Sequence, residues 1–129
     1  KNPRGRLAEI IVLDQFSRNM SRDSSLSFAQ DPLALALAQE AVALGADLAL
    51  SPVERSFLYM PYMHSESLVI HEVATTLFEG TGIKANIDSE VRHKNIIAEF
   101  GRYPHRNELL GRISSAEELE FLTRPGSSF

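Results

Sequence analysis

The chain has 129 residues, of which 43% are hydrophobic and 23% charged, as is usual for one soluble globular domain. Its 13 basic and 17 acidic side chains give a formal net charge of -4, which argues against nucleic-acid binding because such domains usually carry a basic surplus. The absence of cysteine excludes disulfides and thiolate metal sites, and no apolar run approaches the roughly 20 residues that span a bilayer.

The apolar spacing from Leu7 to Met20 predicts a first helix that is apolar nearly all round and therefore buried. Polar groups on such a helix need partners, because unpaired buried charge costs several kcal/mol. The last turn of this helix carries four of them on its buried stripes, namely Asp14, Gln15, Arg18 and Asn19.

A serine-rich loop follows over residues 21–30, with Leu26 and Phe28 as its expected apolar anchors. Asp31 is predicted to cap the next helix, since the proline after it favours the first helical position. This alanine- and leucine-rich helix is expected to end at residue 44, before a glycine.

Ser51 and Glu54 have the spacing of a capping box, which predicts another helix start. Pro61 is expected to end that helix or to open the next one, because proline cannot donate a helical hydrogen bond. The apolar pattern then predicts a long helix over residues 62–78.

Asp88 is predicted to cap a helix that runs to residue 100 and stops at Gly101. Two shorter helices are expected to follow, over residues 104–110 and 116–122. No alternating strand pattern of useful length occurs. The sequence therefore predicts an all-α fold, with six to seven helices in antiparallel hairpins joined by short loops.

We expect a single domain over residues 1–129, and a cytoplasmic one, because no signal-like start is visible. The chain begins Lys-Asn-Pro-Arg instead of with methionine. We therefore expect it to be a fragment that lacks an N-terminal helical segment.

The densest group of recognition side chains lies in the segment 100–107, where a glycine ends one helix and a proline can begin another. A helix N-terminus adds partial positive charge, so an anion would be favoured there. The alternative is that these side chains only cap carbonyls and bridge helices. The candidate residues are Arg102, His105, Arg106 and Asn107.

Asp14 and Arg18 are four residues apart, a spacing suited to an ion pair on a helix. One interpretation is a structural pair at the end of a buried helix. The other is that Arg18 points into a cleft and Asp14 orients it, since the arginine fork suits carboxylate and phosphate oxygens.

His64 and Glu66 follow Pro61, where a histidine could act as acid, base or ligand. On one continuous helix His64 and His71 would share a stripe but lie about 10 Å apart, too far for two ligands of one metal ion. No metal site is expected, and a histidine hydrogen-bonded within the packing is the favoured interpretation.

Three ordered motifs, together with the closing residues 125–129, resemble one bacterial family of unassigned function, the domain of unknown function nine-two-four. This resemblance covers essentially the whole chain. It implies a tetratricopeptide-like all-helical fold, a right-handed array of hairpins, and no established activity. Family members usually begin with an aromatic-rich segment that this chain lacks. The chain also departs from the family pattern at Ser21, where a larger side chain is expected, and at His71, where glutamine is expected. The motifs are residues 13–19, the segment 59–66 with Tyr59-Met60-Pro61 and His64-Ser65-Glu66, and residues 100–112.

These observations favour a binding or scaffold module with a concave helical surface for a protein or peptide partner. The alternative is a small-ligand protein, or an enzyme, with an anion held in a cleft that combines Arg, His and Asp side chains. A third hypothesis is that the motifs only lock the helices together. Whether the domain is an enzyme stays open, and no cofactor is expected. The candidate ligand-binding residues are Asp14, Gln15, Arg18, Asn19, His64, Glu66, Arg102, His105, Arg106 and Asn107.

Overall fold

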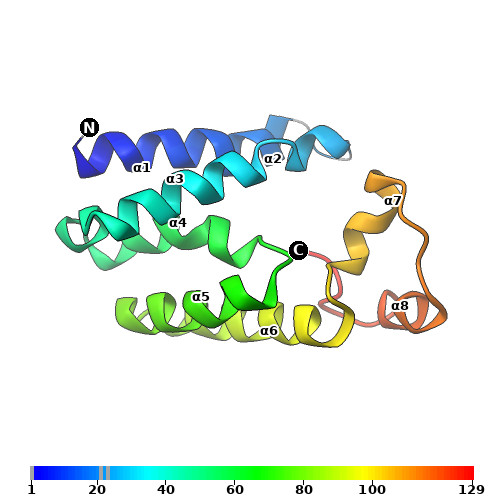
Figure 1. Cartoon of the computed structure of the whole chain (residues 1–129). Helices are drawn as coiled ribbons and strands as arrows, with labels where there is room; N and C mark the ends of the chain where they lie inside the picture. The colour runs from blue at the N-terminus through cyan, green and yellow to red at the C-terminus, as the bar shows by residue number, and fades with distance from the viewer. Residues whose placement is uncertain (1, 21, 23) are drawn as a thin grey trace.

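Helices make up all the regular structure in the computed structural model, which describes residues 2–20, 22 and 24–129 (Figure 1). No strand occurs in these residues, which confirms the all-α prediction. None of the described helices is both long and apolar enough to cross a bilayer. In chain order the elements are α1 (Pro3–Ile11), a π-helical turn (Val12–Phe16), α2 (Ser17–Met20), a 3-10 turn (Ser25–Phe28), α3 (Asp31–Ala43), a 3-10 turn (Ala46–Ala49), α4 (Pro52–Met63), α5 (Leu68–Thr81), α6 (Lys84–Phe100), a 3-10 turn (Pro104–Arg106), α7 (Asn107–Leu110) and α8 (Ala116–Phe121).

Neighbouring helices in the chain are neighbours in space. α1 packs on α3 and α4, α4 packs on α5, and α5 packs on α6. Figure 1 shows two antiparallel hairpins, α3–α4 and α5–α6, with α1 covering the first hairpin and α7 and α8 beside the C-terminal end of α6. The antiparallel hairpins agree with expectation, whereas the tetratricopeptide-like handedness of the array stays a prediction.

The main core lies between α1, α3, α4 and α5. The fully buried residues of α3 are small, because Ala34, Ala38 and Ala41 form its buried stripe and let the neighbouring helices approach closely. Leu35, Leu37 and Val42 of the same helix are partly buried and pack against the core beside this stripe. Larger buried residues fill the opposite side, including Leu58 and Phe78. A second, smaller apolar cluster joins α6 to α8 and consists of Ile96, Ile97, Phe100, Tyr103 and Phe121.

The first helix is less buried than its apolar pattern predicts. Leu7 and Ile10 are buried, but Val12, Phe16 and Met20 are 51%, 52% and 84% exposed. The prediction of a helix buried nearly all round is therefore wrong. The physical reason is its position at the edge of the array, where α3 and α4 cover one side only.

Pro61 neither ends α4 nor opens a new helix. α4 includes Pro61 and continues to Met63, and His64 follows as its C-terminal cap residue. α5 starts only at Leu68, where the Ser67 side chain accepts a hydrogen bond from a backbone N–H of the first turn. The predicted helix over residues 62–78 is thus two helices, and His64 and His71 do not share a helical stripe.

Two predicted aspartate caps are also wrong. The first residue of α3 is Asp31 itself, and its carboxylate binds Arg18 instead of capping the helix. α6 begins at Lys84, and Asp88 lies inside it, where its carboxylate accepts a hydrogen bond from that lysine at 2.6 Å. Ser21, where the sequence departs from the family pattern, lies outside the described residues.

Candidate functional site

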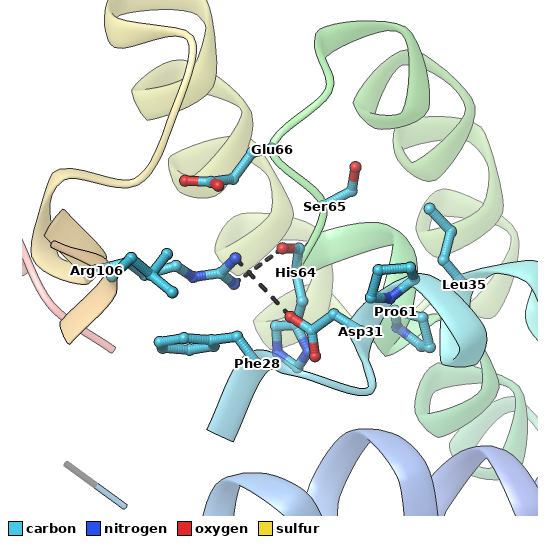
Figure 2. Close-up of a pocket in the computed structure, with 10 residues that line it drawn as sticks. Phe28, Asp31, Leu35, Pro61, His64, Ser65, Glu66 and Arg106 are labelled. Carbon is cyan, nitrogen blue, oxygen red and sulfur yellow. Dashed lines mark hydrogen bonds and ion pairs between the residues drawn. The ribbon is translucent and has the colours of Figure 1, made fainter. Parts of the chain in front are cut away.

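A cavity of about 370 Å³ lies where the start of α3, the end of α4 and the turn Pro104–Arg106 meet. Apolar side chains form part of its wall, among them Leu35, Pro61 and Leu110. Figure 2 shows Arg106 reaching across this cavity toward Asp31 and the backbone of His64. The polar and the apolar parts of the wall therefore face the same cavity.

Asp14 stands beneath this cavity, inside the π-helical turn, and is only 1% exposed. Its Oδ1 atom accepts hydrogen bonds from His64 Nδ1 at 2.8 Å and from Arg18 Nη1 at 3.2 Å. Its Oδ2 atom accepts one from the Gln15 amide at 2.5 Å. The predicted ion pair between Asp14 and Arg18 is therefore present, and it belongs to a larger network that includes His64.

Burial lowers the pKa of His64, although the neighbouring Asp14 carboxylate opposes this effect. For Asp14, burial raises the pKa, but the hydrogen bond and charge of His64, the charge of Arg18 and the Gln15 hydrogen bond outweigh it and lower the pKa. At neutral pH the pair is thus a carboxylate beside a neutral imidazole. Because Asp14 accepts from Nδ1, the proton resides there and Nε2 keeps its lone pair. Nε2 makes no hydrogen bond to any residue that the structure describes.

Arg18 joins this pair to α3. Its Nη1 and Nη2 atoms donate to the two carboxylate oxygens of Asp31, each at 2.8 Å. This is the planar two-point geometry in which an arginine and a carboxylate bind most strongly. The fork ties α2 to the first residue of α3 and accounts for most of the hydrogen-bonding capacity of Asp31.

Arg106 has fewer partners than its burial would require. Its side chain is only 6% exposed, and its guanidinium carbon lies 4.5 Å from the ring centre of Phe28 and 4.8 Å from that of Tyr103. Nη2 donates to the carbonyl oxygen of His64 at 2.9 Å, but Nη1 is 3.8 Å from Asp31 Oδ2, beyond hydrogen-bond distance. Nε is buried and has no partner among the described residues.

Two buried groups hold Tyr103 against this guanidinium. The Tyr103 hydroxyl donates to the carbonyl oxygen of Met63 at 2.5 Å, so toward His71 it can only accept. His71 Nε2 accordingly carries a proton and lies 2.9 Å from that hydroxyl and 2.7 Å from the Ser65 carbonyl oxygen. On its other side His71 Nδ1 is 2.6 Å from Glu90 Oε2, and burial raises the pKa of Glu90.

Glu66 lies at the cavity edge but is already paired. Arg112 Nη1 and Nη2 donate to its two oxygens at 2.9 and 3.0 Å, and the backbone N–H of Tyr103 donates to it at 2.7 Å. Burial raises the pKa of Glu66, but these hydrogen bonds and the nearby arginine charges lower it overall. Glu66 is therefore an ionised carboxylate at the cavity edge, and both of its oxygens already accept hydrogen bonds.

A second cavity of about 500 Å³ shares Phe28 with the first as a lining residue. Arg18 and Asn19 line it from α2, and His105 and Phe129 line it from the C-terminal part of the chain. The ring centres of His105 and Phe129 are 4.3 Å apart. Burial and the nearby Arg106 charge lower the pKa of His105 to about 4, so it is neutral at pH 7.

A family model described as bacterial protein of unknown function (DUF924) matches residues 1–126. The chain belongs to this family. Among solved structures, the protein of unknown function ATU0120 from Agrobacterium tumefaciens is similar, with 36% identity and a TM-score of 0.90 over 94% of this chain and 68% of that chain. No curated protein matches the sequence.

The predicted site residues of this DUF924 domain fall into three groups. Five of them make the network beneath the cavity: Asp14, Gln15, Arg18, His64 and Arg106. Three others lie beside it, with Glu66 on the first cavity and Asn19 and His105 on the second. The structure does not bring the remaining two, Arg102 and Asn107, to either cavity.

Arg102 and Asn107 have structural partners elsewhere in the DUF924 domain. Arg102 forms a fork with Glu118 at 2.8 and 2.7 Å and donates to the Ile113 carbonyl, which fastens α8 to the end of α6. The Asn107 amide donates to Ser114 and accepts from Arg112. Arg102 follows directly after the Gly101 cap of α6, whereas Arg106 ends the 3-10 turn Pro104–Arg106, so the chain between the two arginines directs them to different neighbours.

Sequence reasoning missed Tyr103 and assigned Phe28 and Asp31 to other roles. Phe28 was expected to anchor a loop, yet it lines both cavities, and its ring centre lies within 5.6 Å of both the Arg18 and Arg106 guanidinium carbons. Only the aromatic composition around Arg106 could have pointed to the stacking of Tyr103. Among the described residues, no group of three or more histidine and carboxylate side chains is arranged to hold a metal ion.

Proposed function

We propose that this DUF924 domain binds a small organic ligand in the cavity above Arg106, with an acceptor oxygen of the ligand at the guanidinium group. The observation that carries the proposal is the state of Arg106. Only 6% of this side chain is exposed, yet its Nη1 has no hydrogen bond to any described residue, and the side chain lines a 370 Å³ cavity. A buried polar group without full hydrogen bonding is costly, which supports a ligand as the missing partner.

The remaining wall suits the body of such a ligand. Ligand sites are typically concave, largely apolar and supplied with a few fixed polar groups, and they usually measure roughly 300–1,000 Å³. Leu35, Pro61 and Leu110 offer apolar contact, and the Phe28 ring offers a flat face. The forks of Arg18 with Asp31 and of Arg112 with Glu66 keep the polar groups in place before binding.

A buried titratable cluster beside a cavity distinguishes this proposal from the scaffold hypothesis. A scaffold surface would need no such cluster, since its contacts would be exposed and spread over several helices. The convergence of residues from the turn Ser25–Phe28, α3, α4 and the turn Pro104–Arg106 on one cavity therefore favours a small ligand. Chemistry beyond binding is not required by this arrangement.

The test is a thermal-shift screen of small organic acids, amides and phosphates against the wild-type chain. A ligand at tenfold above its Kd should stabilise the domain by about 1.4 kcal/mol, or about 5 °C in Tm for a domain of this size. Arg106→Gln should abolish the shift. Because that buried variant could fold poorly, Leu110→Trp provides a second test, since it fills the cavity from a partly exposed position and leaves Arg106 itself unchanged.

Arg124→Gln is the matched control, because Arg124 forms an exposed ion pair with Glu120 and neither residue lines the cavity. It should leave every ligand shift unchanged. If no compound shifts Tm, or if shifts persist in both Arg106→Gln and Leu110→Trp, the proposal is wrong.

A peptide-binding role is the second candidate, because one observation favours it. A shallow apolar groove of about 660 Å³ runs between α1 and α3, lined by Ala8, Val12, Leu13, Leu33 and Leu37. Its size and composition suit the apolar face of an amphipathic helix. Val12→Glu should abolish such binding and leave the ligand shifts of the Arg106 cavity intact, which separates the two candidates.

A further inference from the structure

The charges around the Arg106 cavity balance without a ligand. Arg18 forms a fork with Asp31, Arg112 forms a fork with Glu66, and these two pairs cancel. What remains is the positive charge of Arg106 and the negative charge of Asp14, one on either side of His64. With a neutral imidazole the group of six ionised side chains carries no net charge.

An anionic ligand would disturb this balance, and the size of the disturbance depends on its charge. One negative charge at Arg106 Nη1 would leave the site with a single excess charge close to Asp31, whose Oδ2 is 3.8 Å from that atom. A phosphate monoester would bring nearly two charges, and its oxygens would also approach Glu66. The geometry thus tolerates a monoanion far better than a dianion.

His64 can remove this single excess charge by taking up a proton. Its ring lines the cavity, its Nδ1 is held by Asp14, and its Nε2 has no hydrogen-bond partner among the described residues. Burial keeps the ring neutral in the free site, and an added negative charge nearby would favour its protonation. The charged or titratable groups that face His64 come from the π-helical turn, α2, α3, α6 and the turn Pro104–Arg106: Asp14, Arg18, Asp31, His93 and Arg106.

We propose that the ligand of this cavity is a monocarboxylate with a compact apolar body, and that it binds together with one proton, which His64 takes up. This inference rests on the proposed function. The planar carboxylate matches the donors of Arg106, and its charge is neutralised within the site. A neutral amide of the same shape would lose the ionic contact with Arg106. A phosphate ester would bring one negative charge more than the site can neutralise.

Three probes with one ring and different head groups test the proposal: benzoate, benzamide and phenyl phosphate. Titration calorimetry of the intact chain in PIPES and in Tris, which differ in ionisation enthalpy, counts the protons taken up per bound ligand. Benzoate should bind most tightly and take up close to one proton. Its affinity should fall by up to about tenfold per pH unit above the pKa of free His64, whereas benzamide affinity should stay constant.

His64→Asn isolates the group responsible. The asparagine amide can still donate to Asp14 from the position of Nδ1, but it cannot titrate, so proton uptake and the pH dependence should both disappear. His105→Asn is the matched control, because His105 lines the second cavity and not the first. It should leave the proton uptake of the benzoate complex unchanged.

The outcomes separate this inference from the proposed function. Benzoate binding without proton uptake, uptake that persists in His64→Asn, or tighter binding of phenyl phosphate would each overturn the inference. If none of the three probes binds at concentrations up to about 10 mM but the wider screen yields another Arg106-dependent ligand, the inference fails and the proposed function stands. If neither experiment finds an Arg106-dependent ligand, both fail.

Discussion

The Tyr103 hydroxyl gives a direct test of how the floor of the site is held together. Tyr103→Phe removes one oxygen and keeps the ring that stacks on Arg106. The lost hydroxyl donates to the carbonyl of Met63 and accepts from His71, and all three groups are buried. The Met63 carbonyl belongs to the last turn of α4, where carbonyls have no helical partner, so the deletion leaves it without its donor.

The expected cost follows from this loss. A buried acceptor deprived of its hydrogen bond costs about 1–3 kcal/mol, and the isosteric ring leaves no cavity to add to it. We therefore expect the free energy of unfolding to fall by about 2 kcal/mol and Tm to fall by about 8 °C for a domain of this size. Urea unfolding followed by far-ultraviolet circular dichroism measures the change, because the chain contains no tryptophan to report by fluorescence.

Tyr62→Phe is the matched control. Tyr62 is also buried, and it lies in the last turn of α4 next to Met63, but its hydroxyl makes no hydrogen bond to any residue that the structure describes. Its removal should change the free energy of unfolding by less than about 0.5 kcal/mol. If Tyr103→Phe costs no more than Tyr62→Phe, the hydroxyl does not hold the end of α4, and the account of the site floor is wrong.

Three further predictions concern pH, ion pairs and a helix end. The free energy of unfolding should rise between about pH 4 and pH 6.5, because burial lowers the pKa of His93 and of His105 to about 4, and the unfolded chain therefore binds more protons than the folded chain in that window. Each histidine adds a slope of up to about 1.4 kcal/mol per pH unit, so His93→Asn should flatten the pH profile measured by urea unfolding. A flat wild-type profile would contradict the reasoning. Arg102→Gln should lower the free energy of unfolding by about 2–3 kcal/mol, because it leaves the buried Glu118 carboxylate without its arginine partner. Arg124→Gln should lower it by less than about 0.5 kcal/mol, because its pair with Glu120 is exposed. Equal urea midpoints for the two variants would refute this contrast. Gly101→Ala should lower the free energy of unfolding by about 1–2 kcal/mol, because the φ of Gly101 is 72°, a value that alanine rarely adopts. The control Gly80→Ala should be neutral or stabilising, since Gly80 lies inside α5 and an added Cβ meets no neighbour. A lower Tm for Gly80→Ala than for Gly101→Ala would exclude this explanation.

The helix starts that depend on neighbouring residues could be predicted from the sequence, and those that depend on distant residues could not. Ser51 and Ser115 form capping boxes with glutamates three residues later, so the whole interaction lies in a short stretch of chain. Asp31 has the same local appearance of a cap. Its carboxylate instead binds Arg18, 13 residues earlier, and only the packing of α2 against the start of α3 reveals that choice.

The sequence predicted some residues of the candidate site and misplaced others, because their positions depend on contacts between distant parts of the chain. Residues of the Asp14–Asn19 segment come together with His64 and Arg106, as the small-ligand hypothesis required, since Arg18 and Arg106 both approach the Phe28 ring. Arg102 was grouped with Arg106 because the two are close in sequence. The 3-10 turn that ends at Arg106 changes the direction of the chain between them, so Arg102 binds Glu118 whereas Arg106 reaches the cavity. Residue spacing alone does not predict this change of backbone direction.

The π-helical turn over Val12–Phe16 has a consequence for how this segment can change in length. A π turn accommodates one residue more than an α turn, so deletion of one residue there would restore regular α-helical pairing without breaking the chain. Because the π turn takes up its extra residue within about one turn, the residues on either side would stay close to their present phase about the helix axis. Leu7 and Ile10 would keep facing the interior, and Arg18 would keep facing Asp31. The length of the chain can therefore vary by one residue at this turn without displacing the helical segments on either side, provided that Asp14 is not the residue removed.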